Sequence, residues 1–103
     1  MATFDNQTVD QVWNKGQVVA NNDLKVWRKD AYGAWMKRTD YGNRNSQYGW
    51  EIDHIKPASF GGPDSLSNLR PLQWENNAKK QNGHITSPIT SSGVNNTSSQ
   101  ARP

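Results

Sequence analysis

The chain has 103 residues, of which 32% are hydrophobic, and a formal net charge of +3. It contains no cysteine and no apolar run near the roughly 20 residues of a membrane span, which excludes a disulfide framework, a thiolate metal site and a membrane-spanning segment. At this length we expect one modest domain, in which five Trp supply core that the aliphatic residues do not.

The charge is distributed unevenly along the chain. Residues 25–44 carry six basic and two acidic side chains, a net +4, which favours a polyanionic partner, with an ordinary solvated surface as the alternative. The N-terminus lacks the basic start and apolar core of a secretory signal. We therefore expect a cytoplasmic protein and leave export by a signal-independent route open.

The first half of the chain predicts short elements. Val9, Val12 and Trp13 have helical spacing within residues 8–15, with Asn6 or Thr8 as the cap and Gly16 as the stop. Residues 24–28 and 34–38 alternate apolar and basic side chains, which predicts two short strands around a turn. Residues 39–49 are rich in turn formers and predict a loop.

The second half predicts a strand, a loop, a strand and a helix. Residues 50–55 form the first strand and residues 56–67 the loop, which contains Gly61-Gly62. Residues 68–73 return as a strand that Pro71 confines to a sheet edge, and a helix runs from Trp74 to near Gly83. Residues 84–103 are dominated by Ser, Thr and Asn, so we expect a disordered tail after a domain of residues 1–83.

Within this second half, Asp53-His54 is followed by Asn68 and Asn77. Carboxylate and carboxamide oxygens suit a hard divalent cation, which makes Asp53 and Asn77 candidate metal ligands. A neutral imidazole can take a proton from water, which makes His54 a candidate general base. Adjacent residues of a strand point to opposite faces, so we expect the site at the strand end, where the chain can turn both groups toward one phosphate.

Three further polar residues complete this candidate site. Asn68 can brace the loop against the backbone near His54, because a carboxamide both donates and accepts. Lys80 lies three residues after Asn77, hence on the same helix face, where it can approach a phosphate. Glu51 shares a strand face with Asp53 and can orient a neighbouring Arg or Lys. Taken singly, each residue also fits an ordinary structural role; it is their order and spacing that point to catalysis.

The stretch WEIDHIKPASFGGPDSLSNLRPLQWENNAKK resembles the HNH endonuclease motif, D-H-I-x-P followed by G-G, N-L-x-P-L and N-x-x-K. The resemblance implies an α+β protein with a ββα-metal (His-Me finger) core, its motif at residues 49–82. It implies His54 as general base, Asp53 and Asn77 as metal ligands and Asn68 as the loop-bracing residue. The upstream region is similar to that of small stand-alone bacterial or phage members.

Many family members place cysteines around this core to hold a structural zinc. Two of those positions are Gln73 and Asn76 here, so we expect no structural zinc and expect Trp side chains to fill the space. The cofactor expected at the site is Mg²⁺, with Mn²⁺ as the alternative.

The sequence thus predicts a hydrolase that cleaves DNA, in duplex form, with a divalent metal. Arg38 and Arg44 flank the loop that leads into the site, so we expect them to contact backbone phosphates. Two alternatives stay open. One is a nucleic-acid-binding module without turnover, and the other is a toxin-like nuclease effector controlled by an inhibitor or partner protein.

Overall fold

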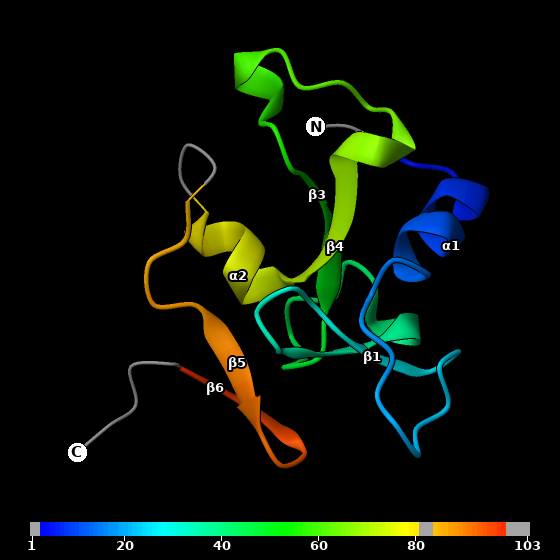
Figure 1. Ribbon diagram of the computed structural model, residues 1–103, viewed down its shortest axis with the longest axis vertical. Coiled ribbons are helices and arrows are strands. Elements are labelled where there is room, and N and C mark those ends of the chain that lie inside the picture. The colour runs from blue at the N-terminus through cyan, green and yellow to red at the C-terminus, as the bar shows by residue number, and fades with distance from the viewer. Residues whose placement is uncertain (1–2, 81–83, 99–103) are drawn as a thin grey trace.

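The computed structural model describes residues 3–80 and 84–98, which form two helices and three antiparallel two-stranded sheets (Figure 1). The elements, in chain order, are α1 (Asn6–Trp13), β1 (Trp27–Lys29), β2 (Trp35–Lys37), β3 (Trp50–His54), β4 (Leu69–Gln73), α2 (Trp74–Lys79), β5 (Ile89–Ser92) and β6 (Asn95–Ser98). This mixture of helices and short antiparallel strands confirms the predicted α+β class. No helix of the described part is long and apolar enough to cross a membrane.

The β3–β4 ribbon is the centre of the molecule, with α1 on one side and α2 on the other (Figure 1). Its register pairs Trp50 with Gln73 and Asp53 with Arg70. Helix α2 follows β4 directly, because Gln73 accepts hydrogen bonds from the amides of Glu75 and Asn76 and so caps the helix. The chain therefore runs strand, loop, strand, helix as the sequence predicts. Helix α2 ends at Lys79, where Lys80 is already extended, so the prediction of a helix that runs to near Gly83 is wrong.

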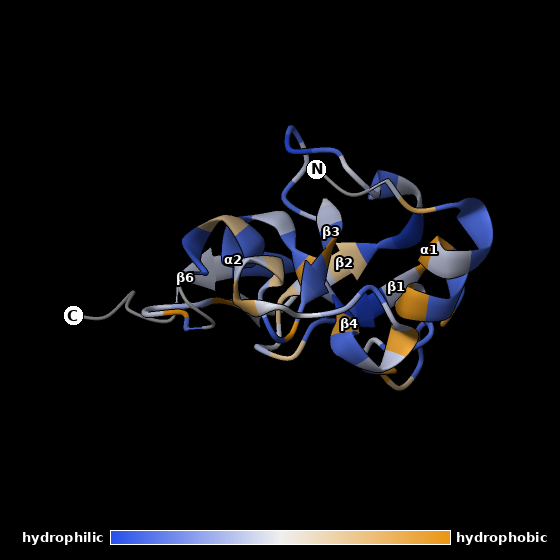
Figure 2. Cartoon of the chain, turned by 90° about the horizontal axis from the view of Figure 1, so that it is seen from above, coloured by the Kyte–Doolittle hydropathy of each residue, from blue (hydrophilic) through white to orange (hydrophobic). Residues whose placement is uncertain are grey.

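Helix α1 supplies one wall of the core. Its buried residues are Val9, Val12 and Trp13, which join Met36, Trp50 and Leu69 in one cluster. Figure 2 shows α1 with both hydrophilic and hydrophobic positions, as a helix with one buried face requires. The prediction of Asn6 or Thr8 as the cap is wrong, because the Asp5 carboxylate accepts from the Thr8 amide at 2.8 Å and the helix starts at Asn6.

The first hairpin, β1–β2, has one buried and one outer face. Arg28 and Met36 are opposite each other in the register and are both buried. The Arg28 guanidinium donates to the carbonyls of Asn14, Gly16 and Leu24. Its charged group therefore binds the backbone of this region and does not lie at the surface. Both strands are shorter than predicted; β2 lies within the predicted segment 34–38, whereas β1 starts later than predicted and ends one residue beyond the predicted segment 24–28.

The expectation of a disordered tail is wrong for residues 84–98, because β5 and β6 form a hairpin that packs on the rest of the chain. This hairpin buries little apolar surface, and hydrogen bonds hold it against the rest of the chain instead. The Asn76 carboxamide bonds both the amide and the carbonyl of Ile89, at 2.7 and 2.9 Å. The Asn96 carboxamide does the same for Trp35, at 2.6 and 3.0 Å. Residues 99–103 of the predicted tail lie outside the described residues.

Candidate active site

An open pocket of about 340 Å³ lies where β3 ends, between the following loop and α2. Four residues singled out from the sequence line it: Asp53, His54, Asn77 and Lys80. Residues 57–59 of the loop form part of the remaining wall. Adjacent strand residues point to opposite faces, and Asp53 and His54 share this pocket because His54 is the last residue of β3.

Asp53 is buried, with 5% of its surface exposed. Each of its two carboxylate oxygens forms an ion pair with a basic side chain. Arg70 Nε donates to Oδ2 at 2.9 Å, and Lys80 Nζ donates to Oδ1 at 2.7 Å. Arg70 is the cross-strand partner of Asp53 in the β3–β4 register, so the sheet itself brings the two together. A buried carboxylate needs such compensation, since an unpaired charge is costly in a low-dielectric interior.

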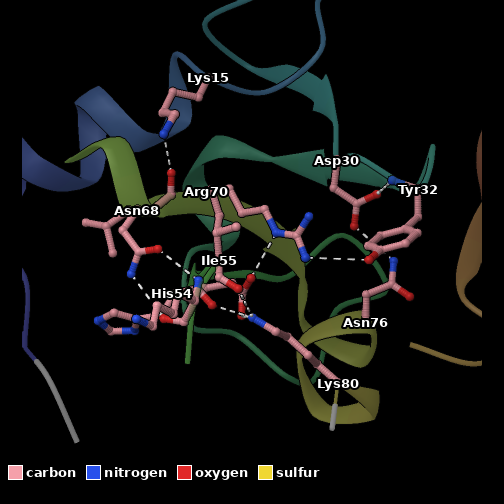
Figure 3. Close-up of polar contacts among 12 residues, drawn as sticks. Lys15, Asp30, Tyr32, His54, Ile55, Asn68, Arg70, Asn76 and Lys80 are labelled. Carbon is pink, nitrogen blue, oxygen red and sulfur yellow. Dashed lines mark hydrogen bonds and ion pairs between the residues drawn. The ribbon is translucent and has the colours of Figure 1, made fainter. Parts of the chain in front are cut away.

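The sequence predicts that Lys80 approaches a phosphate, but in the structure its side chain is buried within the protein. Its side chain is 7% exposed, and its ammonium also donates to the carbonyl of His54 and, at 3.4 Å, to that of Ile55. In Figure 3 the Lys80 side chain reaches toward Ile55, and the His54 ring points away from it. The ammonium therefore ties α2 to the end of β3, and its contact with substrate stays a prediction.

His54 has a partner that the sequence reasoning missed. Its Nε2 lies 2.6 Å from Oδ1 of Asp64, a residue of the β3–β4 loop. With Asp64 ionised, Nε2 carries the proton and Nδ1 keeps the lone pair; this tautomer is assigned from the hydrogen bond. The signal in the sequence was an acidic residue directly after Gly61-Gly62-Pro63, where the loop turns back toward β3.

Asn68 holds the two sides of that loop together. Its Oδ1 accepts from the Lys56 amide at 2.8 Å, and its Nδ2 donates to the carbonyls of Lys56 and Pro63 at 3.1 and 2.8 Å. Gly62 is required in the same turn, because a Cβ there would lie 1.8 Å from the Lys56 oxygen. Asn68 thus makes the contacts that loop bracing requires, and its part in catalysis stays a prediction.

Glu51 connects the pocket to the segment that precedes β3. It accepts two hydrogen bonds from Arg44, at 2.6 and 2.8 Å, and one from Asn77 Nδ2 at 2.8 Å. The Arg44 hydrogen bonds lower the pKa of Glu51, aided by Asn77 and opposed by partial burial. Glu51 thus bonds both Arg44 and the carboxamide of Asn77, and its part in orienting groups for catalysis stays a prediction.

Both arginines predicted to contact phosphate form ion pairs within the protein. Arg44 pairs with Glu51, while Arg38 pairs with Asp10 of α1 at 2.5 Å and lies over the Trp50 ring. Asp10 is 64% exposed, and exposed pairs contribute little stability, so the Arg38–Asp10 pair is weak. Glu51 is 19% exposed and accepts two hydrogen bonds from Arg44, so the Arg44–Glu51 pair is held more firmly.

A polar cluster occupies the positions where relatives carry zinc-binding cysteines, so the expectation that Trp side chains fill this space is wrong. Gln73 and Asn76 are fully buried there. The buried Asp30 carboxylate accepts from Asn76 Nδ2 and from the amides of Gln73, Tyr32 and Ala34, at 2.9–3.0 Å. Burial raises the pKa of Asp30, while these hydrogen bonds oppose the rise.

Within the described residues, no group of three or more His, Cys, Asp or Glu side chains is placed to hold a metal ion. Among the side chains that line the pocket, Asp53 supplies a carboxylate, Asn77 a carboxamide and Ser59 a hydroxyl. An oxygen-rich open site of this kind suits ions that keep water and substrate oxygens among their ligands.

Comparison with known proteins identifies the segment that forms this pocket. Residues 43–84 match the family model described as HNH endonuclease, a range that contains β3, β4, α2 and every residue named as lining the pocket. Neither a curated protein nor a solved structure matches the chain. The predicted family resemblance is therefore confirmed for residues 43–84, the segment that matches the HNH endonuclease model (the HNH segment).

Proposed function

We propose that this chain is a metal-dependent endonuclease that hydrolyses phosphodiester bonds of DNA, with a ββα-metal core formed by β3, β4 and α2. The observation that carries the proposal is the convergence of Asp53, His54 and Asn77 on one open pocket inside the HNH segment. A base and two oxygen donors beside open space are what hydrolysis of a phosphodiester requires.

The residues of the pocket fit a divalent ion. Asn77 donates through Nδ2 to Glu51, which leaves its Oδ1 as the ligand atom, and Asp53 offers a carboxylate. Such oxygen donors suit Mg²⁺ or Mn²⁺. When bound, the ion would neutralise charge on the phosphate and on the leaving oxygen. Because Arg70 and Lys80 already balance Asp53, we expect weak binding that strengthens once a substrate phosphate adds further oxygens.

His54 serves as the general base in this proposal. With Nε2 committed to Asp64, Nδ1 accepts a proton from the attacking water. Asp64 holds the ring in one orientation and stabilises the imidazolium that forms, as the Asp of a hydrolytic triad does for its His. Asn68 and the Gly62 turn keep the loop that carries Asp64 in place.

Substrate contact is assigned to Arg38 and Arg44. Asp10 is mostly exposed, so a phosphate can replace it at Arg38 at small cost. Arg44 is itself 53% exposed, so a phosphate can approach it while its bonds to Glu51 persist. Contacts of this kind do not depend on sequence and are sensitive to salt. We expect duplex DNA as the substrate.

The test is incubation with supercoiled plasmid in Mg²⁺, in Mn²⁺ and in EDTA. Nicked or linear product should form only with a divalent ion. Thermal melting in EDTA should stay unchanged, because the core of α1, β2, β3 and β4 contains no group of the pocket's donor set. Plasmid binding without cleavage in either metal would leave the non-catalytic binding module as the better account.

A further inference from the structure

The outer face of the β1–β2 hairpin alternates Trp and Lys. The register places Trp27 opposite Lys37 and Lys29 opposite Trp35. Because side chains alternate along a strand, these four residues share the face opposite the buried Arg28 and Met36. Trp27, Lys29 and Lys37 are partly exposed on this face, whereas Trp35 is buried, with 8% of its surface exposed. The face is distinct from the candidate active site.

Three aromatic side chains meet at this face. The Trp27 ring meets Tyr48 edge to face, with centroids 5.0 Å apart, and meets Trp35 in the same manner at 6.0 Å. They line a pocket of about 220 Å³ together with Asn22 and Val94, and none of these five residues is charged. The cations lie beside the rings, with Lys29 Nζ 4.6 Å from the Trp35 centroid and Lys37 Nζ 5.7 Å from that of Trp27.

Hydrogen bonds to the β5–β6 turn fix the orientation of two side chains that line this pocket. Trp35 Nε1 donates to the Gly93 carbonyl at 2.7 Å, and the Tyr48 hydroxyl donates to the Val94 carbonyl at 2.7 Å. These bonds satisfy the polar atoms of both side chains, so Trp35 and Tyr48 present only ring atoms to the pocket. Val94, 72% exposed, stands at the rim. No residue is shared between this pocket and the one at His54.

We propose that this aromatic pocket, with Lys29 and Lys37, binds an unpaired base of a single-stranded nucleic acid segment. Base stacking on aromatic side chains tolerates every base, and adjacent lysines pair with the flanking phosphates. A cationic ligand is disfavoured, because two ammonium groups already lie against the rings. The inference rests on the proposed function and adds to it a preference for substrate with an unpaired segment.

Binding in EDTA tests this site without turnover. The probes are a fluorescently labelled oligothymidylate, an abasic oligomer of equal length and charge, and a blunt duplex. Wild-type protein should bind the oligothymidylate roughly tenfold more tightly than the abasic oligomer, the scale of one stacked base. Val94→Glu places a carboxylate at the rim and should weaken oligothymidylate binding by about tenfold.

Val18→Glu is the matched control, since it changes the net charge equally at a residue that is 59% exposed and lies outside the pocket. It should leave binding close to that of the wild type. Lys29→Gln with Lys37→Gln is the second variant and should weaken binding of both oligomers and reduce its salt dependence. Equal binding of the base-bearing and abasic oligomers, or equal effects of Val94→Glu and Val18→Glu, overturns the proposal. Failure of the nuclease proposal is read separately, from plasmid cleavage.

Discussion

Asn76 and Asn77 are neighbours on α2, and replacing each with Ala separates stability from catalysis. Asn76 is fully buried and makes three hydrogen bonds, one to the Asp30 carboxylate and two to the backbone of Ile89. Asn77 is partly exposed, bonds Glu51 and lines the pocket. The two positions therefore hold the same side chain for different reasons.

The size of the effect follows from the groups left without a partner. Asn76→Ala leaves the buried amide and carbonyl of Ile89 without their hydrogen-bond partner and removes one of the four donors to Asp30. Each such loss costs about 1–3 kcal/mol, so we expect a loss of about 3–5 kcal/mol in the free energy of unfolding. A domain of this size loses about 4–8 °C of Tm per kcal/mol, so Tm should fall by about 12 °C or more. Asn77→Ala loses one partly exposed hydrogen bond, worth about 0.5–1.5 kcal/mol.

Thermal unfolding followed by circular dichroism, together with plasmid nicking at a temperature where both variants are folded, makes the comparison. Asn76→Ala should melt far lower than the wild type yet nick DNA, whereas Asn77→Ala should melt near the wild type and lose most of its nicking activity. Raising the Mg²⁺ concentration should restore part of the Asn77→Ala activity. Similar melting temperatures for the two variants would refute the assigned role of the Asp30–Asn76 cluster.

Three further predictions concern the hairpin, the base and an ion pair. Deleting residues 86–103, which a disordered tail would tolerate, should lower the urea midpoint because Asn76, Trp35 and Tyr48 lose their hairpin partners; an unchanged midpoint would show that residues 1–85 suffice. Asp64→Asn should slow cleavage by less than the about 10²–10⁴-fold expected for loss of the base and leave DNA affinity intact, and an unaltered rate would remove Asp64 from the mechanism. Arg44 lowers the pKa of Glu51 below its ordinary 4.5, so the pair's contribution to stability is present above pH 4.5 and is lost as pH falls through the lowered pKa. Urea midpoints measured from pH 6 downward should therefore fall more steeply for the wild type than for Glu51→Gln, and parallel curves would contradict this linkage.

The central elements were predictable because their signals are local. Residues 50–55 and 68–80 carry strand and helix patterns, a loop with Gly-Gly between them, and the spacing of the HNH motif. The convergence of Asp53, His54 and Asn77 on one pocket follows from that order. Residues 8–13 likewise show their helix by the spacing of Val9, Val12 and Trp13.

What was missed depends on partners far apart in the sequence. The β5–β6 segment has one buried hydrophobic residue, Ile89, so its composition indicates disorder, and it is ordered by carboxamides such as Asn76 that bond its backbone. The pairing of Asp53 with Arg70 depends on the strand register, which the sequence does not specify to a single residue.

The N-cap of α1 was misassigned for a local reason, because Asp5, Asn6 and Thr8 are all capable caps within four positions.

The central claim is that His54 acts as the base at a metal-dependent phosphodiester site, and a single-turnover nicking rate in Mg²⁺ tests it most directly. Wild-type protein and His54→Ala are compared at protein concentrations that saturate the plasmid, so that binding does not limit the rate. Loss of the base should lower the rate for His54→Ala by about 10²–10⁴-fold, with an unchanged melting temperature. A His54→Ala rate within a fewfold of the wild type would contradict it.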